Sequence, residues 1–187
     1  MKIGIMVEGA TERLVLRSVA FQETLRRMGL QIAGDVIDVR GRMNLLSEKT
    51  DGIRQLLQQS GAEKLVILTD KEDVSCYSSL KAQINTPVDL IAIANRTIES
   101  WFLADSETLS ALFQTNFFCE LPESVISPID TLKTYRQQFR GMCIGDKKAF
   151  ARIMLNNGFT IERAAEHPNC PSARYFLDKL QTLASAN

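Results

Sequence analysis

The segment that decides the fold is Lys2-Ile3-Gly4-Ile5-Met6-Val7, followed directly by Glu8-Gly9-Ala10-Thr11-Glu12. The nearly continuous apolar run over residues 2–7 predicts a strand covered on both faces, as in a parallel sheet. A helix is expected to begin at Gly9 or Thr11, with Glu12 in its first turn, and to end at Gly29. A buried strand that leads at once into an amphipathic helix is typical of the first unit of an α/β fold.

Three further segments have strand character, and helical patterns separate them. The strands are predicted at residues 31–39, at Lys64–Thr69 (KLVILT) and at Pro87–Ala94 (PVDLIAIA). Helices are predicted between them over residues 45–59 and 75–84. This alternating order predicts a parallel, Rossmann-like sheet with helices on both faces.

From Thr97 onward strand character disappears. We expect a loop over residues 117–128 and helices over residues 98–103, 106–113, 129–139, 147–156, 161–167 and 172–184. The chain therefore divides into an α/β core over residues 1–105 and a helical extension over residues 106–187 that packs on the core.

Composition narrows the class of protein. Of 187 residues, 45% are apolar and 24% charged, and 22 basic side chains balance 22 acidic ones. This balance argues against a partner held by bulk positive charge. No apolar run reaches about 18 residues and no signal peptide is evident, so we expect a cytoplasmic protein without a membrane span. Four scattered cysteines and one histidine favour neither a zinc site nor a disulfide scaffold.

The balanced total hides an asymmetry along the chain. Residues 1–130 contain 13 basic and 18 acidic side chains, a net charge of −5, and residues 131–187 contain 9 and 4, a net charge of +5. An oxygen-ligated metal site beside a surface that binds a polyanion has this distribution. Two solvated faces of different charge have it as well, and the charges alone do not separate the two interpretations.

Acidic residues follow two of the predicted strands directly. Glu8 comes after the first strand and Asp70 after the third, with Glu72 and Asp73 just beyond. Ligands of open parallel sheets bind beyond the carboxyl ends of the strands, so these side chains are expected to converge. Carboxylates gathered at one point repel one another unless a cation offsets their charge, and Mg²⁺ or Mn²⁺ suits such hard oxygen ligands.

Two other acids have an equally simple alternative explanation. Glu12 lies in the first turn of a predicted helix, and Glu99 lies just past the fourth predicted strand. Acidic residues at helix N-termini are stabilised by the helix dipole without any further role. Glu99 is therefore an additional acidic site residue only if its side chain lies beside Glu8 and Asp70.

The motifs resemble those of a known family. Residues 7–12 (VEGATE) resemble the VEGxTE signature of Toprim domains, which are found in topoisomerases, bacterial primases and nucleases of the OLD and RloB-like type. Residues 68–72 (LTDKE) resemble the second Toprim motif, a strand ending in DxD, with Glu72 in place of the second aspartate and Asp73 as a competing candidate. Residues 94–105 and 171–177 are similar to two further stretches of small stand-alone Toprim-like proteins.

The resemblance implies a Toprim-like fold and a site that transfers phosphoryl groups with Mg²⁺ or Mn²⁺. Glu8, Asp70 and Glu72 are then the catalytic residues, with Glu8 as metal ligand or general acid and base and the other two as metal ligands. Glu12 is then a further ligand or a supporting group, and Asp73 an alternative ligand. One or two bound cations orient water and stabilise charge on the phosphate. The implied activity is an endonuclease or nickase, acting in phage defence or DNA repair beside a separate ATPase.

Four basic residues are candidates for binding phosphate or nucleic acid. Lys71 and Arg96 lie close in sequence to the acids, and Lys147 and Lys148 open a predicted helix. The alternatives are surface cations paired with neighbouring acids and a solvated helix face. The aromatic pair at residues 101–102 is expected in the core rather than against a base.

Other functions stay open at this stage. A non-catalytic module that binds nucleic acid or an ATPase, with the same fold, is the alternative to the nuclease. A small-molecule phosphatase or nucleotide-binding protein is a third possibility. DNA is favoured over RNA as the polymer, and the number of metal ions and the oligomeric state, a homodimer included, are left open.

Overall fold

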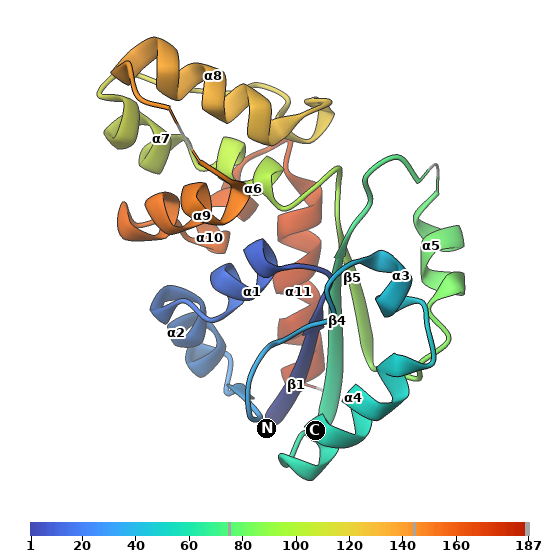
Figure 1. Ribbon diagram of the computed structural model, residues 1–187. Helices are drawn as coiled ribbons and strands as arrows, with labels where there is room; N and C mark the ends of the chain where they lie inside the picture. The colour runs from blue at the N-terminus through green and yellow to red at the C-terminus, as the bar shows by residue number, and fades with distance from the viewer. Residues whose placement is uncertain (75, 144, 186–187) are drawn as a thin grey trace.

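The computed structural model is an α/β fold in which helices flank a parallel sheet, as the sequence predicts, although the sheet has five strands and not the four predicted (Figure 1). It describes residues 1–74, 76–143 and 145–185. The strands run in the order β2-β1-β4-β5, and β3 also pairs with β1. Their bounds are β1 (Lys2–Val7), β2 (Gln31–Ile32), β3 (Ile37–Asp38), β4 (Lys64–Asp70) and β5 (Leu90–Ala94).

The single strand predicted over residues 31–39 is wrong. Two short strands replace it, β2 beside the start of β1 and β3 beside its end, with residues 33–36 between them outside both strands. Gly34 has a φ of 68°, which breaks the extended conformation. Asp35 then turns outward, and its Oδ2 accepts a hydrogen bond of 2.7 Å from Arg13 Nη2.

The single helix predicted up to Gly29 is also wrong. It is two helices, α1 (Ala10–Leu16) and α2 (Val19–Arg27), because Ser18 adopts an extended conformation and caps α2 by accepting a hydrogen bond from the Phe21 amide. The helix predicted over residues 45–59 is likewise split, into α3 (Arg42–Leu45) and α4 (Lys49–Gln59). Both breaks thus lie where the sequence pattern alone predicts one continuous helix.

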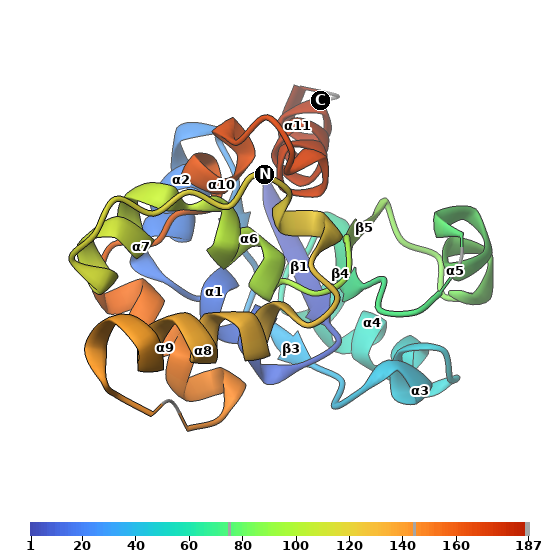
Figure 2. The same ribbon diagram turned by 90° about the horizontal axis from the view of Figure 1, so that it is seen from above.

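Helices cover both faces of the sheet (Figures 1 and 2). Helices α1 and α2 lie on one face, and α3, α4 and α5 (Tyr77–Gln83) lie on the other. Side chains of β1 alternate accordingly, since Ile3, Ile5 and Val7 enter the larger core and Met6 enters the smaller one. The alternation explains why β1 is apolar at nearly every position.

The helices that follow β5 pack on the larger core. Their bounds are α6 (Glu99–Ala104), α7 (Ser106–Phe113), α8 (Pro128–Arg140), α9 (Lys147–Asn156), α10 (Ile161–Glu166) and α11 (Pro171–Ser185), with a 3₁₀ turn, η1, at Pro122–Ser124. Phe176 of α11 stacks on Phe21 and on Trp101, with ring centroids 5.9 and 5.8 Å apart. Trp101 is fully buried, as expected for a core residue.

Ser172 ties the start of α11 to the sheet. Its Oγ accepts hydrogen bonds from Trp101 Nε1 at 2.8 Å and from the Asn95 amide at 3.1 Å, and it donates one to Glu123 Oε1. Every polar atom in this buried group therefore has a partner, which stabilises the junction. The junction explains why two distant motif stretches, 94–105 and 171–177, belong together.

In the described part of the chain no helix is long and apolar enough to cross a membrane.

The order of the strands in the sheet reverses at one point. From β1 the chain first adds strands on one side and then crosses to β4 on the other, so the strand order reverses between β1 and β4. Ligands of open α/β sheets bind at such a switch point, beyond the carboxyl ends of the strands.

Candidate functional site

A cavity of about 300 Å³ lies at this switch point. Acidic side chains dominate its lining, although one lysine and one arginine also reach it. The lining residues are Glu8, Gly9, Ala10, Thr11, Glu12, Asp38, Arg40, Gly41, Asp70, Glu72, Glu99 and Lys147. Glu8, Glu12, Asp70, Glu72 and Glu99, which the sequence singles out, are thus brought together.

Glu8 lines the cavity because it directly follows β1, one of the two strands between which the strand order reverses. Its Oε2 accepts a hydrogen bond of 2.5 Å from Thr69 Oγ1 and one of 3.4 Å from the Asp70 amide, both at the end of β4. Arg42 Nε lies 3.8 Å from the same oxygen. Glu8 is therefore fixed across the two strands on either side of the switch point.

Arg42 is a site residue that the sequence analysis missed. Its Nη2 donates a hydrogen bond of 2.8 Å to the Asp70 carbonyl and lies 3.1 Å from Glu72 Oε2. It reaches these groups because β3 ends at Asp38 and the following turn leads directly into α3. The signal available in the sequence is the cluster Asp38–Arg42 (DVRGR) after a short parallel strand, read together with the acids after its neighbours.

Asp70 is buried and anchored. Its Oδ1 accepts a hydrogen bond of 2.9 Å from the Ile98 amide, which joins the end of β4 to the start of α6. Burial, reinforced by the negative charges of Glu12 and Glu99, raises the pKa of Asp70 well above its usual value. The geometry thus holds a carboxyl group where its ionised form is disfavoured.

Glu12 lies in the first turn of α1 and is buried like Asp70, with only 4% of it exposed. Burial raises the pKa of Glu12 from 4.5 to about 7, and repulsion by Glu99 and Glu8 acts in the same direction. A helix N-terminal acid that was merely stabilised by the dipole would have a lowered pKa instead. The cavity therefore dominates the electrostatics of Glu12.

Glu99 lies deepest, with 1% exposure, and neither carboxylate oxygen has a hydrogen-bond partner. Lys147 Nζ, at the start of α9, lies 3.7 Å from Glu99 Oε2. Burial lowers the pKa of Lys147, but attraction by Glu99 and Asp70 outweighs this effect, so its pKa lies above the ordinary value. A lysine from the basic end of the chain thus offsets part of the acidic charge.

Two residues of the lining have strained backbones. Arg40 and Glu72 have φ values of 62° and 47°, in the left-handed region that side chains with a Cβ rarely adopt. Arg96 nearby has a φ of 60°, and the Glu72 amide donates a 2.7 Å hydrogen bond to its carbonyl oxygen. Backbone strain gathered around one cavity points to a functional site.

The other predicted residues lie outside the cavity. The Asp73 side chain is 99% exposed and pairs with Arg96 Nη1 at 3.2 Å, so Glu72 and not Asp73 lines the cavity. Lys71 Nζ lies over the ring of Tyr77, 4.8 Å from its centre. Lys148 is exposed, whereas its neighbour Lys147 reaches the acids.

The chemistry of the cavity fits a hard divalent cation. Its donors are carboxylate oxygens, two of which, both on Glu99, are buried without a partner. As the side chains stand, no three histidine, cysteine or acidic groups in residues 1–74, 76–143 and 145–185 are placed to hold one ion. Glu8, Glu12, Asp70, Glu72 and Glu99 could hold a cation after side-chain rotation.

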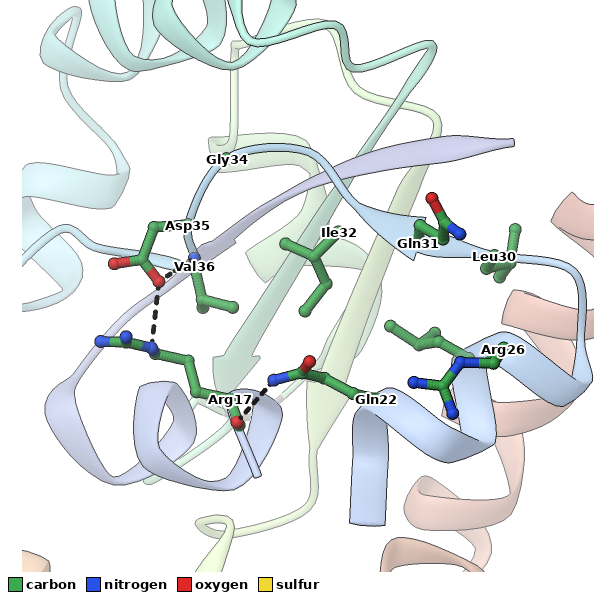
Figure 3. Close-up of a pocket in the computed structure, with 10 residues that line it drawn as sticks. Arg17, Gln22, Arg26, Leu30, Gln31, Ile32, Gly34, Asp35 and Val36 are labelled. Atoms are coloured by element: carbon green, nitrogen blue, oxygen red, sulfur yellow. Dashed lines mark hydrogen bonds and ion pairs between the residues drawn. The ribbon is translucent and has the colours of Figure 1, made fainter. Parts of the chain in front are cut away.

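A second cavity, of about 360 Å³, lies beside β2 at the edge of the sheet (Figure 3). Its charged side chains pair with their neighbours, since Arg17 Nε lies 3.1 Å from Asp35 Oδ1 and Arg26 pairs with Glu23. Gln22 Nε2 donates a hydrogen bond to the Arg17 carbonyl. The polar groups named here already have partners, so the carboxylate cavity is the stronger candidate.

Comparisons of the chain with models of protein families, with curated proteins and with solved structures give no significant match. Conclusions about function therefore rest on the geometry and chemistry of the carboxylate cavity.

Proposed function

We propose that the protein is a Toprim-like, metal-dependent phosphodiesterase, an endonuclease or nickase that uses Mg²⁺ or Mn²⁺. The proposal combines the motif resemblance of residues 7–12 and 68–72 with the cavity in which those motifs meet. DNA is the favoured substrate. A separate ATPase partner and a role in defence or repair come from the resemblance alone.

One observation carries the proposal. Glu12, Asp70 and Glu99 are each at least 94% buried beside Glu8, at the point where the strand order reverses. Burial, reinforced by repulsion among the acids, raises the pKa of Glu12 and of Asp70. A protein gains no stability from buried carboxylates that repel one another, and perturbed acids in a cavity are typical of a site for chemistry.

The residues suggest a division of labour. Glu8, fixed by Thr69 and Arg42, is placed to accept a proton from an attacking water molecule. Arg42 and Lys147 place positive charge beside the carboxylates, where a phosphate would otherwise be repelled. Glu8, Asp70, Glu72 and the neighbouring acids would hold a divalent cation, which would supply charge stabilisation and orient the water.

A non-catalytic module remains the second candidate, and Lys147 is the observation that favours it. Its ammonium group lies among Glu99, Asp70 and Glu12 and already offsets part of their charge. A cavity balanced in this way could keep its shape without a cation. In that case the chain would bind nucleic acid or an ATPase without cleaving anything.

A cleavage assay separates the two candidates. Supercoiled plasmid, single-stranded DNA and single-stranded RNA are incubated with the protein in Mg²⁺, Mn²⁺ or EDTA, beside Glu8→Gln and Glu166→Gln purified in the same way. Glu166 is exposed on α10 and serves as the matched control. We expect cleavage that needs the metal, survives in Glu166→Gln and falls at least a hundredfold in Glu8→Gln.

Cleavage by Glu8→Gln at the rate of the unmodified protein would refute the catalytic assignment of Glu8. Binding without cleavage under every metal would favour the non-catalytic module. Calorimetric titration with Mg²⁺ gives an independent measure of the ion site. Asp70→Asn, which keeps an acceptor for the Ile98 amide, is expected to weaken that binding strongly.

A further inference from the structure

Two half-exposed tyrosines form a cleft at the opposite edge of the sheet from β2. Tyr77 at the start of α5 is 39% exposed, and Tyr175 on α11 is 37% exposed. Together with Ile93 of β5 and Pro171 they line a mostly apolar cavity of about 330 Å³. Figure 2 shows β5 between α5 and α11, so the cleft lies along the outer strand of the sheet.

Three lysines surround these two rings. Lys71 Nζ lies 4.8 Å from the centre of the Tyr77 ring, and Lys81 Nζ and Lys179 Nζ lie 5.1 and 5.5 Å from that of Tyr175. Lys81 Nζ also donates a 3.2 Å hydrogen bond to the Tyr175 hydroxyl. Of the described residues that line the cleft none is acidic, so it attracts anions while it offers flat aromatic surfaces.

Lys71 and its neighbour Glu72 relate the cleft to the carboxylate cavity. A third hollow, of about 500 Å³, is lined by acidic as well as basic side chains, namely Lys71, Glu72, Asp73, Val74, Asn95, Arg96, Glu123 and Ser124. Glu72 also lines the carboxylate cavity, and Lys71 also lies over Tyr77. A ligand that runs along this line meets the carboxylate cavity first, then Lys71 and Arg96, the second of which pairs with the exposed Asp73, and then two aromatic rings.

We propose that this cleft binds the bases of a single-stranded nucleic acid whose backbone continues over Lys71 and Arg96 into the carboxylate cavity. Aromatic rings beside a basic groove are the usual means of binding unpaired strands, since every base has a flat face to stack. A base that stacks on Tyr77 or Tyr175 displaces a lysine ammonium group, which then contacts the adjoining phosphate. Bases within a duplex are already stacked and cannot enter the cleft.

This inference rests on the proposed function for its direction, because the strand is taken to be the substrate of the carboxylate site. The binding itself requires no cleavage. It is therefore measured in EDTA, by fluorescence anisotropy with a labelled 20-nucleotide oligo-dT. Oligo-U of the same length, an abasic strand of the same charge and a blunt duplex are measured in parallel.

Tyr77→Ala and Tyr175→Ala are each expected to raise the Kd for oligo-dT about tenfold, whereas the two Tyr→Phe variants stay within about twofold of the unmodified protein. The abasic strand is expected to bind weakly to all of them. Phe139→Ala is the matched control, because Phe139 on α8 is 39% exposed and lies outside the cleft. Tighter binding of oligo-dT or of oligo-U identifies which polymer the cleft prefers.

The contribution of the lysines to binding is measured by the dependence of the binding constant K on salt concentration. Lys81→Ala is expected to reduce the slope of log K against log salt concentration by about 0.7, the share of one phosphate contact on a single strand. Lys2→Ala, at the opposite end of β1 from the cavity, is expected to leave the slope unchanged. The Tyr→Phe variants retain the ring, so they separate the loss of the ring from the loss of the hydroxyl group.

Unchanged affinity in both Tyr→Ala variants, equal loss in Phe139→Ala, or a duplex bound as tightly as the strand would each overturn the inference. Binding that depends on the tyrosines, in a protein that never cleaves, would support the cleft and refute the nuclease. Metal-dependent cleavage with no effect of the tyrosines on binding would support the nuclease and refute the cleft.

Discussion

Lys147 Nζ lies 3.7 Å from Glu99 Oε2 and so brings the basic end of the chain into contact with its acidic part. Lys147 is the first residue of α9 and Glu99 the first residue of α6, so the pair joins the N-terminal ends of two helices. The opposite net charges of residues 1–130 and 131–187 are therefore more than two unrelated solvated faces. At least one basic residue enters the acidic cavity itself.

Removing this lysine should leave Glu99 as an unpaired buried charge. We expect Lys147→Met to lower the free energy of unfolding by about 1–2 kcal/mol at pH 8, less than for a fully buried pair because Lys147 is half exposed. Lys148→Met, at the exposed neighbouring position, is expected to change it by less than about 0.5 kcal/mol. Urea unfolding measures both, and equal losses in the two variants would contradict the role given to the Lys147–Glu99 pair.

Stability should fall as the pH rises through the range in which Glu12 loses its proton. The pKa of Glu12 is about 7 in the folded protein against an ordinary 4.5, so between these values the folded chain binds more protons than the unfolded chain. The loss is complete above pH 7 and amounts to about 3 kcal/mol for this group. Asp70, whose pKa is also raised, changes stability in the same direction.

Glu12→Gln isolates this contribution. Without Mg²⁺, the variant is expected to be more stable than the unmodified protein at pH 8, with the difference disappearing towards pH 4.5. Urea unfolding at several pH values in EDTA measures the difference, and Glu166→Gln, on the exposed face of α10, should show none of it. A pH profile of Glu12→Gln parallel to that of the unmodified protein would show that Glu12 ionises normally.

Long periodic patterns and strand ends could be predicted from the sequence. β1 and α9 have the predicted bounds, 2–7 and 147–156, because each has a clear apolar pattern and a clear start. Glu8 and Asp70 meet as expected, since the carboxyl ends of neighbouring parallel strands lie at one edge of the sheet. Two well-marked strands were thus sufficient to locate the cavity.

Details that depend on single side chains could not be predicted. The break in the first helix depends on Ser18 capping α2, and the split of residues 31–39 depends on Gly34 and on Asp35 pairing with arginines. Arg42 reaches the cavity only because of the turn after β3. Sequence separation hides the contacts of Arg42, because its partners lie at and just beyond the ends of other strands.

Arg42 should hold the two strand ends in register. Its guanidinium contacts the Asp70 carbonyl and the carboxylates of Glu8 and Glu72, and a lysine can replace only part of this set. We expect Arg42→Ala to reduce metal-dependent cleavage at least about tenfold and Arg42→Lys to reduce it less. Arg54→Ala is the control, because that arginine is similarly buried on α4 and pairs with Asp51 outside the cavity. A loss of cleavage in Arg54→Ala equal to that in Arg42→Ala would mean that general destabilisation is the cause.

The packing of α4 on β1 gives a prediction that is independent of function. A Cβ atom at Gly4 would lie 2.9 Å from Leu57 Cβ and 2.9 Å from Leu65 Cδ2, so α4 must move away from β1 to admit it. We expect Gly4→Ala to lower the free energy of unfolding by about 1–3 kcal/mol, the cost of overpacking a core.

Gly52 is the matched control for Gly4, because it lies within α4 itself and a Cβ there would meet no atom within 4 Å. Gly52→Ala should instead stabilise the protein by about 0.5–1 kcal/mol, since alanine loses less backbone freedom than glycine in a helix. The two substitutions add the same methyl group, one at the contact between α4 and β1 and the other on the exposed side of α4, so opposite signs in urea unfolding would establish that α4 rests directly on Gly4. A Gly4→Ala variant as stable as the unmodified protein would show that α4 can move away from this face of the sheet without cost. The segment from β3 through Arg42 to α4 could then shift with it.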